Sequence, residues 1–302
     1  MYPFDNRNYK LNQTFLKFLG LWPYKKTKFQ RLRAICFNAL LFSYMIVQLT
    51  QFTIVDFHLD VVIRILGEAF PAIIYFIKFN LFFYDAEMIK QILERIINDW
   101  RIFTDIQEIK IVEHYARQGR QLMIFLISFT SVAVFGYATM VMMPDILNYY
   151  LPLNESRIHY LSPVNEYSGY QNIYFYPLFL YIMASVIIGM LTLVAVGSML
   201  MSIILHICAI FKISSYWMEH IVDKEIIARS DRQYVIIERI IKSVELHRNA
   251  QKLIEMLMSS YIVFLSSMTS IGVISLSLNL FRVSATLSSL SLVNIFRILS
   301  AS

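Results

Sequence analysis

The chain has 302 residues, of which 57% are hydrophobic and only 16% are charged, whereas an ordinary soluble domain carries about 25% charged residues. This composition excludes an ordinary soluble enzyme. The formal net charge of +6 does not indicate a nucleic-acid partner, because an uneven distribution of cations around membrane helices accounts for it.

Four stretches without Asp, Glu, Lys or Arg, at 34–55, 121–144, 167–211 and 256–281, each exceed the roughly 20 apolar residues that cross a hydrocarbon core. Together with a fifth segment that is less apolar, they predict an all-α fold, a polytopic transmembrane helical bundle that occupies residues 34–281. The predicted spans are 34–55, 65–84, 121–144, 173–211 and 256–281.

Residues 1–33 form the predicted N-terminal tail, which contains an amphipathic segment. Lysines such as Lys10 and Lys17 interrupt this tail before any apolar core of signal-peptide length. We therefore expect the first span to act as its own insertion signal.

The second predicted span, 65–84, carries Glu68 and Lys78. Long charged side chains near the end of a span can reach the interface or a wet interior. This interpretation is favoured over a dedicated ion site.

The run at 167–211 is long enough to hold two spans, but two spans would place the cations that follow Lys212 outside. Pro177 is the only proline in the run, so we predict one long helix that is preceded by an external segment.

In the charged segments, apolar residues recur at helical spacing, which predicts that the helices continue into the cytosol. Met88, Ile92, Ile96 and Trp100 are an example.

Lysine and arginine counts predict the orientation. The segments 1–33, 85–120 and 212–255 hold 22 of them, and the alternate side holds four, so we expect a cytosolic N-terminus. Asn154 begins a glycosylation sequon in a loop predicted to face outward. A second sequon, at Asn12, is expected to be cytosolic and unmodified.

No catalytic or cofactor-binding motif is present, so the sequence predicts neither an enzyme nor a bound cofactor. The nearest approach to a metal site is a group of acidic residues around His220. Because Glu219 and His220 point in different directions on a helix, a solvated charged face is favoured and no metal is expected.

Aromatic residues, methionines and small residues gather in the half of the spans predicted to lie in the outer leaflet. Rings and flexible thioethers suit a pocket for small lipophilic molecules, although an interfacial aromatic belt with ordinary core packing explains the same residues. The candidate ligand-binding residues are Phe70, Ile74, Ala133, Gly136, Tyr137, Met140, Phe179 and Met183.

Several strings resemble the insect odorant receptor family. They are the segment Leu16-Lys17-Phe18-Leu19-Gly20-Leu21-Trp22-Pro23, the end of the fourth span at 206–213, and the stretch from 244 through the fifth span to Phe281. The resemblance covers essentially the whole chain.

This resemblance implies a seven-span receptor in the plasma membrane of a sensory neuron dendrite, with a cytosolic N-terminus and contacts to membrane lipid. It also implies a small-molecule odorant as the ligand, bound in the outer half of the bundle. Members of the family assemble with a co-receptor subunit into hetero-tetrameric, ligand-gated cation channels whose last span lines the pore.

Residues 282–302 form the predicted C-terminal tail, in which only 14 residues, 283–296, are uncharged. This length is too short for a span. We therefore expect a chain truncated before the family's last two spans.

Two other functions stay open from the sequence. A gustatory-type receptor shares the topology, and its distinguishing features would lie in the last span. A secondary transporter would favour internal repeats and matched broken helices, which the sequence does not show.

Overall fold

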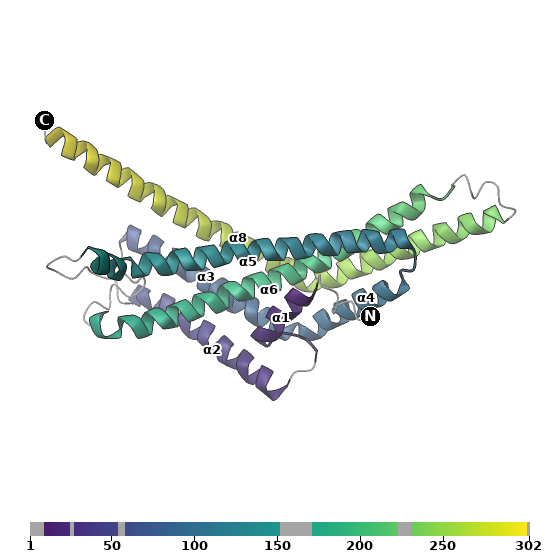
Figure 1. Ribbon diagram of the computed structural model, residues 1–302, viewed down its shortest axis with the longest axis horizontal. Helices are drawn as coiled ribbons and strands as arrows, with labels where there is room; N and C mark the ends of the chain where they lie inside the picture. Colours follow the sequence, from purple (N-terminus) through teal and green to yellow (C-terminus); the bar gives the residue numbers. More distant parts are fainter. Residues whose placement is uncertain (1–8, 25–26, 54–57, 152–170, 223–230, 301–302) are drawn as a thin grey trace. The chain divides into compact units, whose positions relative to one another are not determined.

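The computed structural model describes residues 9–24, 27–53, 58–151, 171–222 and 231–300, and all the regular structure in these ranges is helical (Figure 1). The fold is therefore the predicted all-α bundle. Its elements are α1 (Lys10–Leu19), α2 (Lys28–Thr50), the short 3-10 helix η2 (Gln51–Thr53), α3 (Leu59–Tyr84), α4 (Ala86–Ile102), α5 (Ile106–Tyr150), α6 (Gln171–Glu219) and α8 (Arg232–Ser300).

Within the described ranges, three helical segments are long and apolar enough to cross a membrane: Lys28–Thr53, Ile106–Tyr150 and Phe175–Glu219. They overlap with the first, third and fourth predicted spans. The second predicted span lies within α3 and the fifth within α8, and the boundaries of all five spans stay predictions. One uninterrupted helix, α6, covers residues 171–211 of the run in which two spans were conceivable.

Amphipathic periodicity explains α4. Its buried side chains include Ile89, Ile92, Leu93 and Ile96, which recur at the spacing of one helix face. The sequence placed this face around Met88, Ile92, Ile96 and Trp100, and the structure turns it slightly, so that Met88 and Trp100 are half-buried at its edge.

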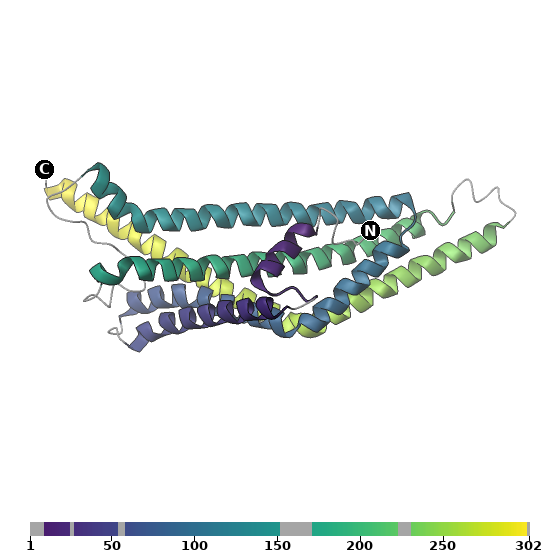
Figure 2. The same cartoon turned by 60° about the horizontal axis from the view of Figure 1, so that its bottom comes forward.

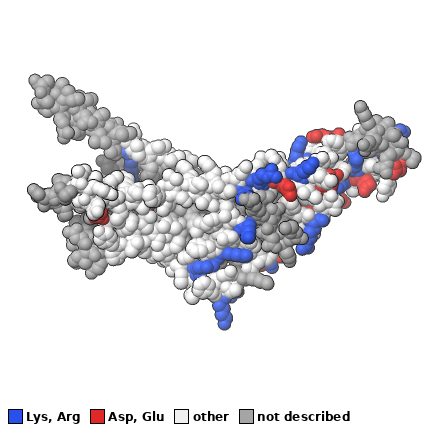
Figure 3. Space-filling view, viewed as in Figure 1, with Lys and Arg blue, Asp and Glu red and all other residues white. Residues whose placement is uncertain are grey.

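The chain divides into two compact units. The first unit comprises 1–34, 81–129 and 191–264, and the second comprises 35–80, 130–190 and 265–302. Most of the charged residues belong to the segments of the first unit. In Figure 3 the blue and red side chains accordingly gather over α4 and the ends of α5, α6 and α8 that belong to this unit.

A glycine turn and a buried amide hold α1 in the first unit. Gly20 ends α1 with φ of 76°, a left-handed conformation that glycine adopts without a Cβ clash. Asn12 is buried, and its amide donates to Ser202 Oγ at 3.1 Å and accepts from Ser198 Oγ at 2.8 Å. Both amide atoms therefore have partners on α6.

Charged side chains join other helices of the first unit. Glu108 on α5 has a fully buried side chain and accepts from Lys242 Nζ of α8 at 2.7 Å and from Trp217 Nε1 of α6 at 2.7 Å. Lys242 also lies 4.3 Å from the Trp217 ring centroid. Asp99 of α4 pairs with His206 of α6 at 3.0 Å.

Polar pairs also join helices of the second unit, where α2 and α3 lie side by side (Figures 1 and 2). Asn38 of α2 and Asn80 of α3 exchange two hydrogen bonds of 2.9 Å. Ser43 of α2 and the hydroxyl of Tyr181 of α6 are 2.8 Å apart. Such pairs satisfy polar groups that would otherwise be left in an apolar environment.

The core of the second unit is aromatic and aliphatic. Its buried members are Tyr44, Ala72, Val141, Phe175 and Ile182. They come from α2, α3, α5 and α6, so four helices meet around one cluster. The two cysteines, Cys36 and Cys208, are exposed.

Candidate ligand-binding cavity

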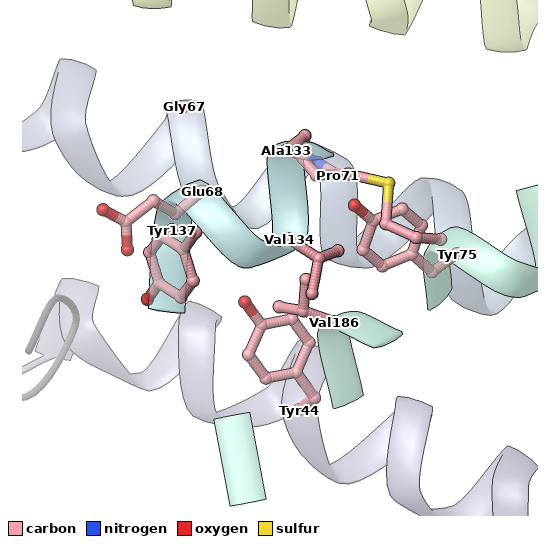
Figure 4. Close-up of a pocket in the computed structure, with 10 residues that line it drawn as sticks. Tyr44, Gly67, Glu68, Pro71, Tyr75, Ala133, Val134, Tyr137 and Val186 are labelled. Atoms are coloured by element: carbon pink, nitrogen blue, oxygen red, sulfur yellow. The ribbon is translucent and has the colours of Figure 1, made fainter. Parts of the chain in front are cut away.

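A cavity of about 270 Å³ lies inside the second unit (Figure 4). Four helices provide its described lining. α2 gives Tyr44, α3 gives Gly67, Glu68, Pro71 and Tyr75, α5 gives Ala133, Val134 and Tyr137, and α6 gives Val186 and Met190. The cavity is slightly smaller than the pockets of roughly 300–1,000 Å³ that hold drug-sized ligands, so it suits a smaller molecule.

A proline shapes the α3 wall of the cavity. Pro71 lies inside α3 and has no N–H to donate to the carbonyl of residue 67, four positions earlier. Asn279 of α8 donates to that Gly67 carbonyl at 3.3 Å. A Cβ on residue 67 would lie 3.1 Å from Asn279 Oδ1, so glycine there lets the amide approach.

The polar atoms of the lining are unevenly placed. In Figure 4 the Glu68 carboxylate and the Tyr137 ring lie at one end of the group, Tyr75 lies at the other, and Val134 and Val186 lie between them. None of the described lining residues is Lys, Arg or His. The cavity therefore combines apolar walls with one carboxylate and three phenols.

The predicted ligand residues fall into three groups. Ala133 and Tyr137 line the cavity. Phe179 packs against the adjoining aromatic core, and Met183, one turn further along α6, is buried. Phe70, Ile74, Gly136 and Met140 are outside the described lining. Met140 is 76% exposed, and a Cβ on residue 136 would meet nothing within 4 Å.

Helix rotation explains the last group. Successive residues are about 100° apart on a helix. The lining positions of α3, at 67, 68, 71 and 75, therefore centre roughly 100° from the side that carries Phe70 and Ile74. On α5 the lining positions 133, 134 and 137 are rotated in the same direction from Gly136 and Met140. The sequence spacing grouped residues that share a helix face, but the face that lines the cavity is the adjacent one.

Sequence reasoning omitted several lining residues from the candidate site, among them Tyr44, Glu68, Pro71 and Tyr75. Two of them carried a signal. The carboxylate of Glu68 within a predicted span was attributed to an interface or a wet interior, and Tyr75 was among the aromatic residues of the second span. An acidic residue near a proline inside a span is typical of a functional position.

Asn154, the predicted glycosylation site, lies outside the described residues. Asp223 and Glu225 of the charged group around His220 lie outside them as well. Across the residues that the structure does describe, no set of three His, Cys, Asp or Glu side chains is arranged to hold a metal ion.

Comparison with known proteins supports one family. No curated protein matches the sequence significantly. The family profile described as the seven-transmembrane odorant receptor matches residues 59–298, which is well over half of the chain and includes α3, α4, α5, α6 and nearly all of α8. The chain therefore belongs to the odorant receptor family.

Proposed function

We propose that this odorant receptor binds small volatile or lipophilic molecules in the cavity of the second unit. We further propose that it acts with a co-receptor subunit in a hetero-tetrameric, odorant-gated cation channel. The observation that carries the first part is the group of Tyr44, Tyr75, Tyr137 and Met190, which line one cavity from four helices. Aromatic rings and a thioether adapt to apolar ligands of different shape.

The lining favours one kind of ligand. Its apolar walls suit a compact hydrocarbon body, and the Glu68 and Tyr137 end offers hydrogen bonds to one polar group. The expected ligands are alcohols, esters and phenols.

The same proposal places the chain in the plasma membrane with a cytosolic N-terminus and with lipid around its apolar helices. The distribution of Lys and Arg, 22 against four, supports this orientation. Glycosylation at Asn154 would accompany it, and an Asn154→Gln variant should then lose the mobility shift that a glycosidase removes.

Binding is tested on the purified chain in lipid nanodiscs. A ligand that binds the folded state raises the melting temperature, so a panel of n-alkanols, alkyl esters and alkylphenols is screened by thermal shift. Ala133→Phe should fill the cavity and abolish the shift. Gly136→Phe is the matched control, because residue 136 is on the same helix and open on its side. Equal shifts in both variants would contradict binding in this cavity.

The channel part of the proposal needs a separate measurement. The chain is expressed in oocytes with a co-receptor, and current is recorded for the ligands that bind. An odorant-evoked current that Ala133→Phe removes would support a channel subunit. Binding without such a current would limit the chain's activity to recognition, and proton- or sodium-dependent uptake would indicate a transporter instead.

A further inference from the structure

The backbone of α6 touches an aromatic ring of α3 beside the cavity. Gly189 is buried, and a Cβ on residue 189 would lie 2.5 Å from Cγ and 2.8 Å from Cε2 of Tyr75, and closer still to Cδ2. Carbon atoms in contact prefer about 3.5–4.0 Å. The Tyr75 ring therefore lies directly against α6 at a place where only glycine leaves room.

The ring cannot yield easily to a larger residue. The three atoms named belong to one rigid ring and not to the end of a flexible chain, so the whole ring must rotate or shift. Tyr75 is only 4% exposed, which means that neighbouring side chains surround it. The Tyr75 ring also lines the cavity, which is the empty space that a displaced ring can enter.

We propose that Gly189 is a specificity-determining residue that sets the length of ligand the cavity accepts. By letting the Tyr75 ring rest on α6, it keeps open the end of the cavity opposite Glu68 and Tyr137 (Figure 4). This inference rests on the proposed function, and it concerns one end of the site only. Ligands that extend from the polar end to the Tyr75 end are the ones affected.

The first experiment compares short and long ligands on the purified chain. Members of one homologous series, the n-alkanols, are titrated against the native chain and Gly189→Ala. A displaced ring should weaken the longest native ligands roughly tenfold or more, as overpacking in a filled site does, and leave the short members unchanged. Gly197→Ala is the matched control, because residue 197 is also on α6 and its added Cβ would meet nothing within 4 Å.

The second experiment identifies the ring as the cause. Gly189→Ala combined with Tyr75→Ala removes the clash, so long ligands should bind again. Gly189→Ala combined with Tyr75→Phe keeps the ring without its hydroxyl, so long ligands should stay excluded. Tyr75→Ala alone should extend the longest accepted ligand, which keeps the proposal testable if Gly189→Ala does not fold.

The outcomes separate the two claims. If Gly189→Ala binds long ligands as the native chain does, or loses short and long ligands equally, the inference is overturned. The proposed function still stands in that case when Ala133→Phe abolishes binding and Gly136→Phe does not. If no cavity variant changes binding, the site itself is wrong. Rescue by Tyr75→Phe as effective as rescue by Tyr75→Ala would also overturn the role of the ring.

Discussion

Buried polar side chains are used differently in the two units. In the first unit they join helices far apart in the sequence, as Glu108 does with Trp217 and Lys242. In the second unit polar pairs such as Asn38 and Asn80 also join helices, but the helices in addition surround a cavity whose phenols and carboxylate lie among apolar walls. Satisfied polar contacts specify one arrangement of helices, whereas aromatic walls adapt to what they enclose. The contrast agrees with the proposal that the second unit is the one that binds a ligand.

The largest expected effect concerns the orientation of the first unit, which holds most of the charged residues. If its Lys and Arg excess marks the cytosolic side, epitope tags at the N-terminus and beside Lys224 should bind antibody only after the cells are permeabilised. A tag beside Glu155 should bind antibody on intact cells. Surface staining of the N-terminal tag would reverse the proposed orientation and assign the first unit to the outside.

Glu108→Leu should break the strongest polar contact of the first unit. It leaves Trp217 Nε1 without its acceptor and Lys242 without its ion partner, which should lower the free energy of unfolding by about 3 kcal/mol. Thermal melting in nanodiscs measures this loss. Exposed Glu94 on α4 provides the control variant, Glu94→Leu. Equal melting temperatures for the two variants would remove the distinction between the units.

Asn279→Leu tests the contact that Pro71 requires in the second unit. The variant removes the donor to the Gly67 carbonyl, and leaving that carbonyl unpaired should cost about 1–2 kcal/mol. In a Pro71→Ala background the new N–H can serve Gly67, so the same variant should cost less. A double-mutant cycle measures the difference. Ser277→Ala is the control, because its hydroxyl donates to the Val273 carbonyl of the same helix. Additive costs of Asn279→Leu and Pro71→Ala would contradict the link.

The smallest expected effect comes from an exposed ion pair of the first unit. Lys90 Nζ and Glu87 Oε1 are 3.3 Å apart on the surface of α4. Exposed pairs contribute little, so Lys90→Ala should change the free energy of unfolding by no more than about 0.5 kcal/mol. A loss comparable to that of Glu108→Leu would show that burial does not distinguish the two contacts.

The sequence alone determined the elements of this protein. Charge-free stretches predicted long apolar helices, because a chain in hydrocarbon must satisfy its own backbone. The periodicity of α4 predicted its buried face to within a small rotation, since water on one side and a core on the other leave a polar and an apolar face. The Gly20 turn lies in the same string of residues that carried the family resemblance.

Only the tertiary structure decided which helix faces meet. On α3 and α5, the helix faces that carry Phe70 and Gly136 are about as apolar as the faces that line the cavity, because lipid and core favour the same side chains. Without a polar face, periodicity cannot distinguish inward from outward, and the predicted face was therefore rotated by about one residue. The partners of Glu108 and the contact of Gly189 with Tyr75 join segments more than 100 residues apart. Such pairs depend on how the helices pack, which no local pattern in the sequence records.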